Sequence, residues 1–114
     1  LASADVFVNV AGGVRVDEPG ADLAVALAVV SAHRGEPLAD ASGTPLACFG
    51  EVGLTGELRS VGHADRRLAE ARKFGLAPVL GPAEREAMKG LAPQATIRAA
   101  LGSAFGRRAA ARAA

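Results

Sequence analysis

The amino-acid sequence predicts an α+β domain, in which a mixed sheet is covered by helices packed on one side. Strand patterns open the chain, and helix and strand patterns alternate after them, which together predict this class. A third observation concerns the core. Hydrophobic residues make up 50% of the 114 residues but aromatic residues only 4%, so we expect one aliphatic core of Ala, Val and Leu.

Two short strands are expected at the start of the chain. In DVFVNV, residues 5–10, a valine occupies every second position, which is the period of a strand. Gly12 and Gly13 supply a turn, and VRV at 14–16 returns as a second strand.

A helix is expected to follow, beginning in the stretch DEPGADLAVALAVVSA, residues 17–32. Pro19 suits its first turn, where the N–H that proline lacks would have no partner. Only two of the residues from 21 to 32 are polar, so we expect protein to surround the helix on most sides. Gly35 is the expected C-terminal cap.

The later elements are predicted from short apolar runs between turn-forming residues. Strands are expected at 46–52, 57–61, 76–80 and 95–99. The second of these should pair with the first, or lie near it, after the LTG turn. Helices are expected at 64–75, at 82–90 and in a last turn that ends at Phe105. The predicted domain comprises residues 1–106, followed by a mobile basic and Ala-rich tail at 107–114.

Charge is distributed unevenly along the chain. Residues 1–57 carry two basic and eight acidic groups, whereas residues 58–114 carry eleven basic and four acidic groups. Such asymmetry is typical of an anion-binding surface, or of head-to-tail subunit contacts between an acidic and a basic face. The alternative is a solvated helix face followed by a basic tail.

Several kinds of catalytic and cofactor site are absent from the sequence. It contains no G-x-x-x-x-G-K-[ST] phosphate loop and no dinucleotide-binding glycine pattern. Cys48, His33 and His63 are scattered, so no metal site is predicted. Cys48 lies in an apolar run and is expected to be an inert buried thiol. No apolar run reaches the roughly 18 residues that a membrane span requires.

Three motifs, in order along the chain, resemble one family. They are GGVRVDEPGADLAVALAVVS, GEVGLTGELRSV and RRLAEARKFG. Together they closely resemble the C-terminal Lon-protease-like domain of the bacterial DNA-repair protein RadA (also called Sms), over about residues 5–105. The resemblance implies the α+β fold of Lon proteolytic domains, which is ribosomal S5 domain 2-like.

The resemblance also implies a protease site that lacks its catalytic groups. In Lon proteases the corresponding stretch reads roughly D-G-P-S-A-G, and its serine nucleophile falls on Gly20 in D-E-P-G-A-D. The general-base lysine, which follows the G-E-x-x-L-x-G motif, falls on Asp65. A carboxylate thus replaces the amine that would activate a hydroxyl, and the hydroxyl is missing as well. No catalytic residue is therefore expected in this domain.

Further expectations concern the parent protein. The resemblance implies a bacterial, cytoplasmic and nucleoid-associated protein of recombination and repair. Its Lon-like domains would form a homo-oligomeric ring, a hexamer, that stacks on an ATPase ring and contacts DNA. Since the chain starts at Leu1, we expect it to be a piece of that protein. The missing DNA-dependent ATPase and zinc-finger domains would hold ATP, Mg²⁺ and Zn²⁺, and no cofactor is expected in this piece.

Six basic residues in or beside the motifs are candidates for contact with DNA: Arg15, Arg59, Arg66, Arg67, Arg72 and Lys73. Contact of this kind goes to phosphates, so it would be independent of base sequence and strongly salt-dependent. Base stacking is not expected, because the Phe residues lie in predicted apolar positions. Alternatively, some of these residues pair with Glu57, Asp65 or Glu70 and hold the sheet to the helix.

Three function classes remain. The favoured one is a ring-forming, DNA-binding, non-catalytic module. The second is a protein-interaction platform that oligomerises without touching DNA, which salt-sensitive DNA binding would distinguish from the first. The third is an active Ser/Lys peptidase, which needs a serine at position 20 and a lysine at position 65, and the sequence has neither.

Overall fold

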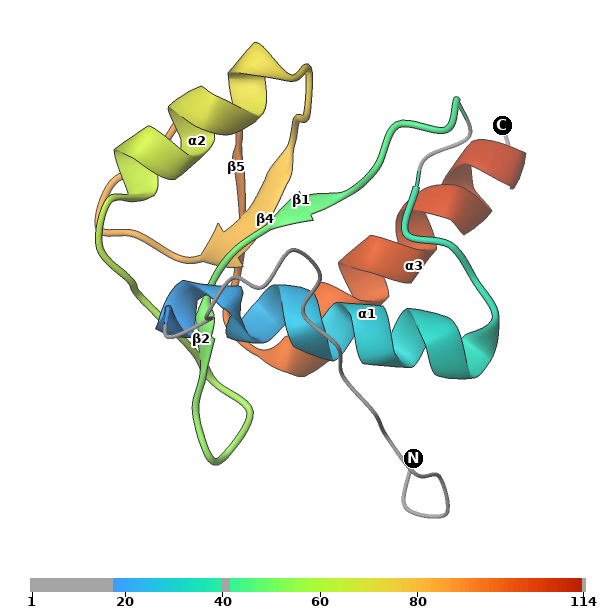
Figure 1. Ribbon diagram of the computed structural model, residues 1–114, viewed down its shortest axis with the longest axis horizontal. Helices are drawn as coiled ribbons and strands as arrows, with labels where there is room; N and C mark the ends of the chain where they lie inside the picture. Colours follow the sequence, from blue (N-terminus) through green and yellow to red (C-terminus); the bar gives the residue numbers. More distant parts are fainter. Residues whose placement is uncertain (1–17, 40–41, 114) are drawn as a thin grey trace, which may run out of the picture.

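The computed structural model describes residues 18–39 and 42–113, with side chains described as far as residue 106 (Figure 1). The strands expected at 5–10 and 14–16 lie outside the described residues. The described part contains a parallel sheet, a separate antiparallel ribbon and three α-helices. This combination confirms the predicted α+β class.

The expected first helix is present. It begins with a 3₁₀ segment, η2 (Pro19–Ala21), which continues into α1 (Asp22–Arg34). Pro19 occupies the first turn, as predicted. At the other end Gly35 adopts the left-handed conformation, with φ 67°, and caps the helix. Both ends of this helix were therefore predictable from sequence.

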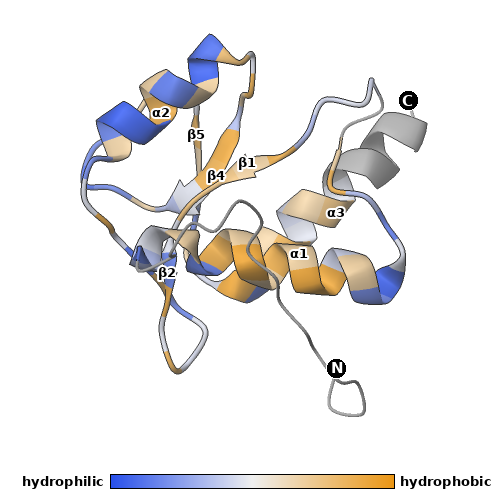
Figure 2. Cartoon of the chain, viewed as in Figure 1, coloured by the Kyte–Doolittle hydropathy of each residue, from blue (hydrophilic) through white to orange (hydrophobic). Residues whose placement is uncertain are grey.

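The burial of α1 differs from the expectation. Leu23 and Leu27 are fully buried, but Ala24 and Ala28 are exposed and Val25 is 41% exposed. Among the described residues, protein does not surround the helix on most sides. Figure 2 shows hydrophobic colour along most of α1, so its apolar residues extend well beyond the stripe that faces the sheet.

Two kinds of strand pairing make up the described sheets. The strands β1 (Ala47–Cys48), β4 (Val79–Pro82) and β5 (Leu91–Gln94) form a parallel sheet in the order β1-β4-β5. The strands β2 (Glu51–Val52) and β3 (Leu58–Arg59) form an antiparallel ribbon. The ribbon confirms the predicted pairing across the LTG turn.

The single strand expected at 46–52 is broken in the middle. At Gly50 the chain leaves the parallel sheet and turns toward α1, with φ 151°. The Gly50 N–H donates to the carbonyl of Gly20 at 2.9 Å, and the Gly50 carbonyl accepts from the Leu23 N–H at 3.0 Å. These two bonds tie the start of the helix to the break, so β1 and β2 belong to different sheets.

Helices cover both faces of the parallel sheet, not one side as expected. Val79 and Leu80 are successive residues of β4, so their side chains point to opposite faces. Leu80 packs with Leu23 and Leu27 of α1 and with residues of α3. Val79 packs with Leu68 of α2 (Ala64–Lys73) on the other face. Two small core clusters therefore share one central strand, and one of them includes the buried aromatic residue Phe49, so the core is not purely aliphatic as expected.

The last third of the chain holds both a confirmed and a corrected prediction. The helix predicted at 64–75 is α2, in which Leu68 and Ala71 are buried. The helix expected at 82–90 is absent. Pro82 instead ends β4, shifted from the predicted 76–80, and pairs in register with Gln94 of β5. A proline is tolerated here because β1 pairs only with Val79 and Leu80, so β4 has a partner strand on one side only at Pro82.

The final helix begins and ends elsewhere than expected. α3 (Ile97–Ala113) starts inside the strand predicted at 95–99 and continues past Phe105. The Thr96 hydroxyl accepts from the N–H of Ala99 at 3.1 Å, which is the contact of a helix N-cap. The boundary predicted at residue 106 does not coincide with the end of this helix. None of the helices in the described part is long and apolar enough to span a membrane.

Candidate functional site

The turn that carries the predicted nucleophile position is held by one carboxylate. Glu18 caps η2, and its Oε1 accepts from the N–H of Gly20 at 3.0 Å. This bond is the main reason that the pKa of Glu18 lies below its ordinary value, and the Arg67 guanidinium lowers that pKa further. The backbone of Gly20 is therefore fixed from both sides, by Glu18 and by Gly50.

The space beside Gly20 is filled by an arginine from α2. A β-carbon on Gly20 would lie 2.9 Å from Nη1 of Arg67 and 3.0 Å from its Cζ. Gly20 itself is buried. A serine at this position would therefore meet a guanidinium group where its side chain must project. Any side chain at position 20 would displace the end of the Arg67 side chain from this place.

Arg67 is held by contacts within the domain. Its Nη2 lies 2.9 Å from Oε1 of Glu18 and its Nε donates to the carbonyl of Gly62 at 3.0 Å. Its Cζ lies 5.6 Å from the centroid of the Phe49 ring. The side chain is 27% exposed. Arg67 was predicted to contact phosphate, but its geometry is that of a residue that joins α2 to the Gly20 turn.

Asp65, the position predicted to match the Lon lysine, is exposed in the first turn of α2. His63 precedes this helix with φ 66°. Among the described residues, no hydrogen bond joins His63 to Asp65. A carboxylate in the first helical turn interacts favourably with the helix dipole, and that role accounts for Asp65 here.

Arg59 is paired, as the alternative interpretation expected. Its Nη2 and Nε lie 2.9 and 3.2 Å from Oε1 of Glu57. Glu57 also accepts from the hydroxyl and the N–H of Thr55. The Thr55 hydroxyl is the main reason that the pKa of Glu57 is lowered to about 2, and the backbone N–H of Glu57 and the Arg59 guanidinium lower it further. This cluster holds the turn of the β2–β3 ribbon.

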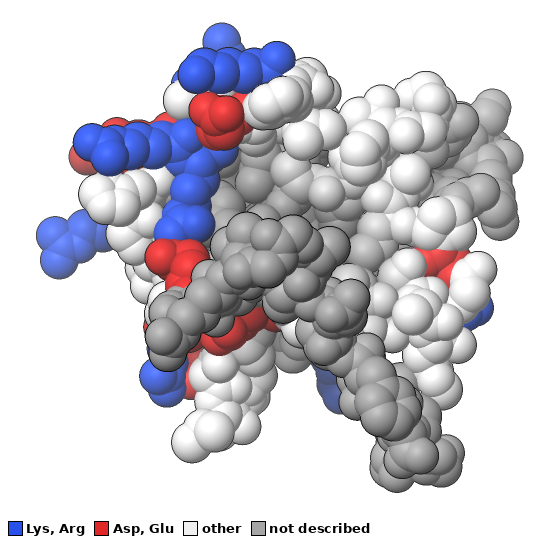
Figure 3. All heavy atoms as spheres, in the orientation of Figure 1, with Lys and Arg blue, Asp and Glu red and all other residues white. Residues whose placement is uncertain are grey.

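The other predicted DNA contacts lie on the exposed side of α2. Arg66 is exposed and forms no ion pair with another described residue. Lys73 lies 3.4 Å from Glu70, and both side chains are largely exposed. Arg72 donates to the carbonyl of Lys89 at 3.3 Å. Arg15 lies outside the described residues. Figure 3 shows Lys and Arg side chains gathered over α2.

Two features of this surface were missed by sequence reasoning. The bond from Arg72 to Lys89 brings the segment 83–90 against the end of α2, where a separate helix was expected. Phe74, expected in an apolar position, is 70% exposed. The sequence did contain a signal for this exposure. Phe74 directly follows the last residue of an amphipathic helix and precedes Gly75.

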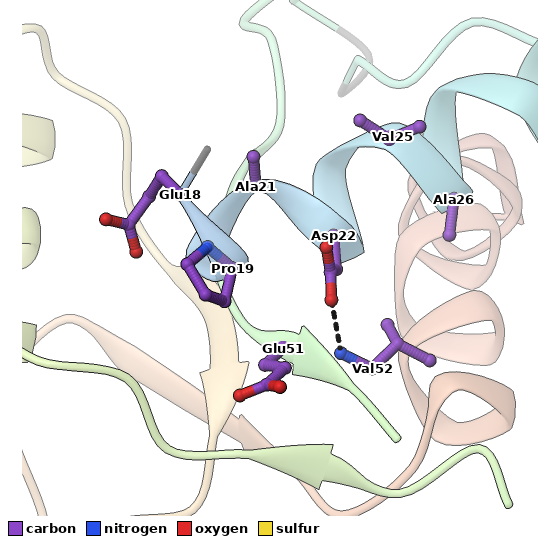
Figure 4. Close-up of a pocket in the computed structure, with 8 residues that line it drawn as sticks. All are labelled: Glu18, Pro19, Ala21, Asp22, Val25, Ala26, Glu51 and Val52. Atoms are coloured by element: carbon purple, nitrogen blue, oxygen red, sulfur yellow. Dashed lines mark hydrogen bonds between the residues drawn. The ribbon is translucent and has the colours of Figure 1, made fainter. Parts of the chain in front are cut away.

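An acidic groove lies on the other side of the Gly20 turn (Figure 4). It encloses about 660 Å³ and is lined by residues of η2, α1 and β2, including Glu18, Asp22 and Glu51. Oδ2 of Asp22 accepts from the N–H of Val52 at 3.1 Å, which fixes β2 against α1. No group of three potential metal ligands occurs in the described part of the chain.

Known proteins are similar to this chain in sequence. Residues 1–104 match the model of the Lon protease (S16) C-terminal proteolytic domain. Relatives include the DNA repair protein RadA of Aquifex aeolicus (51% identical over 82 residues), of Escherichia coli (49% over 83) and of Streptococcus pneumoniae (42% over 83). These matches cover 72%, 73% and 72% of this chain, which spans only 18%, 17% and 19% of those relatives. They confirm the resemblance to RadA seen in the three motifs. The chain belongs to the family of the Lon protease (S16) C-terminal proteolytic domain.

Proposed function

We propose that this chain is a non-catalytic Lon-type domain that provides subunit contacts and DNA contacts to a RadA-like DNA-repair protein. The observation that carries the proposal is the Arg67 guanidinium beside Gly20, at the position predicted for a nucleophile. The relatives named DNA repair protein RadA, at 42–51% identity, support the repair context.

The loss of protease activity follows from three properties of the site. Gly20 has no nucleophilic atom, and the Arg67 side chain occupies the adjacent space. Asp65 is an exposed carboxylate and offers no amine to act as a general base. Neither a nucleophile nor its activating base is available at these positions.

DNA contact is proposed on α2. Arg66 and Lys73 stand seven residues apart and so share one helix face. Arg66, Arg72 and Lys73 are all exposed. Arg59 and Arg67 form ion pairs within the domain, with Glu57 and Glu18, and are left out of this surface. Three phosphate contacts would give a slope of log K against log salt of about −3 for a duplex.

Ring formation is proposed from charge complementarity between two parts of the domain. The groove with Glu18, Asp22 and Glu51 is acidic, whereas residues 58–114 carry eleven basic and only four acidic groups. A cyclic ring uses heterologous contacts, so the acidic surface of one subunit meets a different surface of its neighbour. We propose a hexamer in the bacterial cytoplasm, close to the nucleoid. ATP, Mg²⁺ and Zn²⁺ would bind in parts of the protein outside this chain.

A protein-interaction platform without DNA contact is the second candidate function. It is favoured by exposed apolar side chains away from α2. Leu54, at the tip of the β2–β3 ribbon, is fully exposed, and Val25 of α1 is 41% exposed. Such residues suit a partner protein better than phosphate groups.

Light scattering after size-exclusion chromatography, with and without a short duplex at low and high salt, tests the proposal. We expect a mass near six protomers, with duplex co-eluting at low salt only. A variant with Arg66→Ala, Arg72→Ala and Lys73→Ala should keep the mass and lose the duplex, whereas Arg98→Ala, a control at an exposed arginine of α3, should keep both. A ring that never binds duplex favours the platform. Hydrolysis of unstructured peptides by the purified chain contradicts the non-catalytic assignment.

A further inference from the structure

An exposed aromatic ring stands at the basic end of α2. Phe74 follows the last helical residue, Lys73, and is 70% exposed, whereas Phe49 is buried in the core. Gly75, with φ 68°, turns the chain directly after it. The ring of Phe74 thus lies beside a helix end whose last turn carries Arg72 and Lys73.

One edge of this ring borders an apolar groove between α2 and β1. The groove encloses about 330 Å³ and its apolar lining includes Ala71, Leu76 and Val79. Arg67 and Glu70 are the two charged residues that line it. An apolar groove with a few polar groups at its rim is the usual form of a small-ligand site, and its size lies at the lower end of the range for such sites.

Basic residues lie near the same ring. The hydrogen bond from Arg72 Nη1 to the Lys89 carbonyl, 3.3 Å long, brings the backbone of Lys89 to the end of α2, and Lys89 is exposed. The ion pair between Glu70 and Lys73 is exposed and therefore weak. A polyanion can displace such a pair, since it offers Lys73 another negative partner.

We propose that this surface, the Phe74 platform, binds single-stranded DNA. The platform comprises Phe74, the groove beside it, and Arg72, Lys73 and Lys89. One base stacks on the Phe74 ring and reaches into the groove, while neighbouring phosphates contact the three basic side chains. Cationic side chains beside an exposed aromatic ring are the usual components of single-strand sites. This inference rests on the proposed DNA contact and names its substrate class.

The chemistry favours a single strand over the other occupants. In a duplex the base faces are already stacked on one another, so Phe74 would find no free face. A protein partner that filled the groove would also have to bring acidic groups to three separate cations. A flexible strand supplies an unstacked base and several phosphates from one chain.

Binding measured on the 114-residue chain tests the platform. Phe74→Leu keeps the apolar contact and removes the aromatic face, so we expect it to weaken binding of an oligo(dT) strand about tenfold. The same variant should bind an abasic oligonucleotide of equal length as the unchanged chain does, because only phosphates contact it. Phe74→Trp introduces a tryptophan into the described surface of a chain that has none, so its fluorescence should fall when oligo(dT) stacks.

The outcomes separate the inference from the function on which it rests. Equal loss of both oligonucleotides, or no loss of either, in Phe74→Leu overturns the stacking role while phosphate binding stands. Failure of the unchanged chain to bind any oligonucleotide overturns the DNA contact, and the platform with it. A change in the oligomeric mass of Phe74→Leu without DNA assigns the ring to a subunit interface and overturns the platform.

Discussion

Arg67 Nη1 lies 2.9 Å from the position that a β-carbon on Gly20 would take. The two residues are 47 positions apart in sequence, yet a side chain at position 20 would meet the guanidinium of Arg67. Gly20 leaves room for the guanidinium, and the guanidinium links Glu18 at 2.9 Å to the Gly62 carbonyl at 3.0 Å. The absence of a side chain at position 20 therefore leaves the space that the Arg67 guanidinium occupies.

The first prediction is that Gly20→Ser destabilises the domain through Arg67. The new side chain displaces the guanidinium from its partners, and we expect the free energy of unfolding to fall by about 1–2 kcal/mol. In an Arg67→Ala background the same change should be nearly neutral. A double-mutant cycle measured by chemical denaturation gives the coupling between the two sites directly.

A matched control for this cycle is Gly102→Ser in α3. A β-carbon at Gly102 meets no atom within 4 Å, so this change should be neutral or slightly stabilising in a helix. If Gly20→Ser is as harmless as the control, or if its effect is the same with and without Arg67, the close approach has no energetic consequence.

Local signals explain which elements the sequence predicts. The helix α1 was predictable at both ends because Pro19 and Gly35 each act within one turn of the chain. The break at Gly50 was not, because it depends on bonds to Gly20 and Leu23, about 30 residues away. The segment 82–90 has helix formers, but Pro82 is used in the parallel pairing with β5.

The candidate site also combines features set by local sequence with features set by distant contacts. That Gly20 and Asp65 lack the chemistry of a nucleophile and a base can be read from their residue types. That Arg67 points inward, while its neighbour Arg66 is exposed, depends on the position of Glu18 on another element. Six basic residues could therefore be named from sequence. Which of them pair within the domain and which stay on the surface depends on how α2 packs against η2.

A second prediction concerns acid stability. The pKa of Glu57 is about 2 in the folded domain, below its ordinary value of 4.5, chiefly because of the Thr55 hydroxyl. A carboxyl with a depressed folded pKa stabilises the fold above its unfolded pKa, and the contribution is lost as pH falls from 4.5 toward 2. Glu57→Gln should therefore flatten this part of the curve of unfolding free energy against pH. Glu86→Gln, at an exposed residue, is the control and should leave the curve unchanged.

A third prediction concerns the cysteine. Desolvation raises the pKa of the Cys48 thiol to about 11. The residue is half-buried, less than expected, and lines the groove between α2 and β1. Since the thiolate is the reactive form, iodoacetamide should modify Cys48 much more slowly at pH 8 than it modifies a free cysteine. The rate should rise toward pH 11, and unfolding in urea should abolish the protection. Rapid labelling of the native chain at pH 8 would contradict the raised pKa of this thiol.

A fourth prediction compares two positions of α1. Leu27 is fully buried beside Leu80, whereas Val25 is 41% exposed. Leu27→Ala should lower the free energy of unfolding by about 2–5 kcal/mol, because it leaves a cavity between α1 and the sheet. Val25→Ala should change it by less than about 1 kcal/mol. Equal effects at the two positions would mean that the outer face of α1 is also covered by protein in solution.

The last prediction separates two adjacent arginines by their effect on DNA binding. Arg66 is exposed and carries the proposed phosphate contact, so Arg66→Ala should reduce the slope of log K against log salt for a short duplex by about 0.9. Arg67 is engaged by Glu18, Gly62 and Phe49. Arg67→Ala should therefore lower the thermal midpoint while leaving the salt slope unchanged at temperatures where the domain is folded. If the two variants reduce the slope equally, Arg67 leaves its internal partners to meet DNA, and the Gly20 position is then open when DNA is bound.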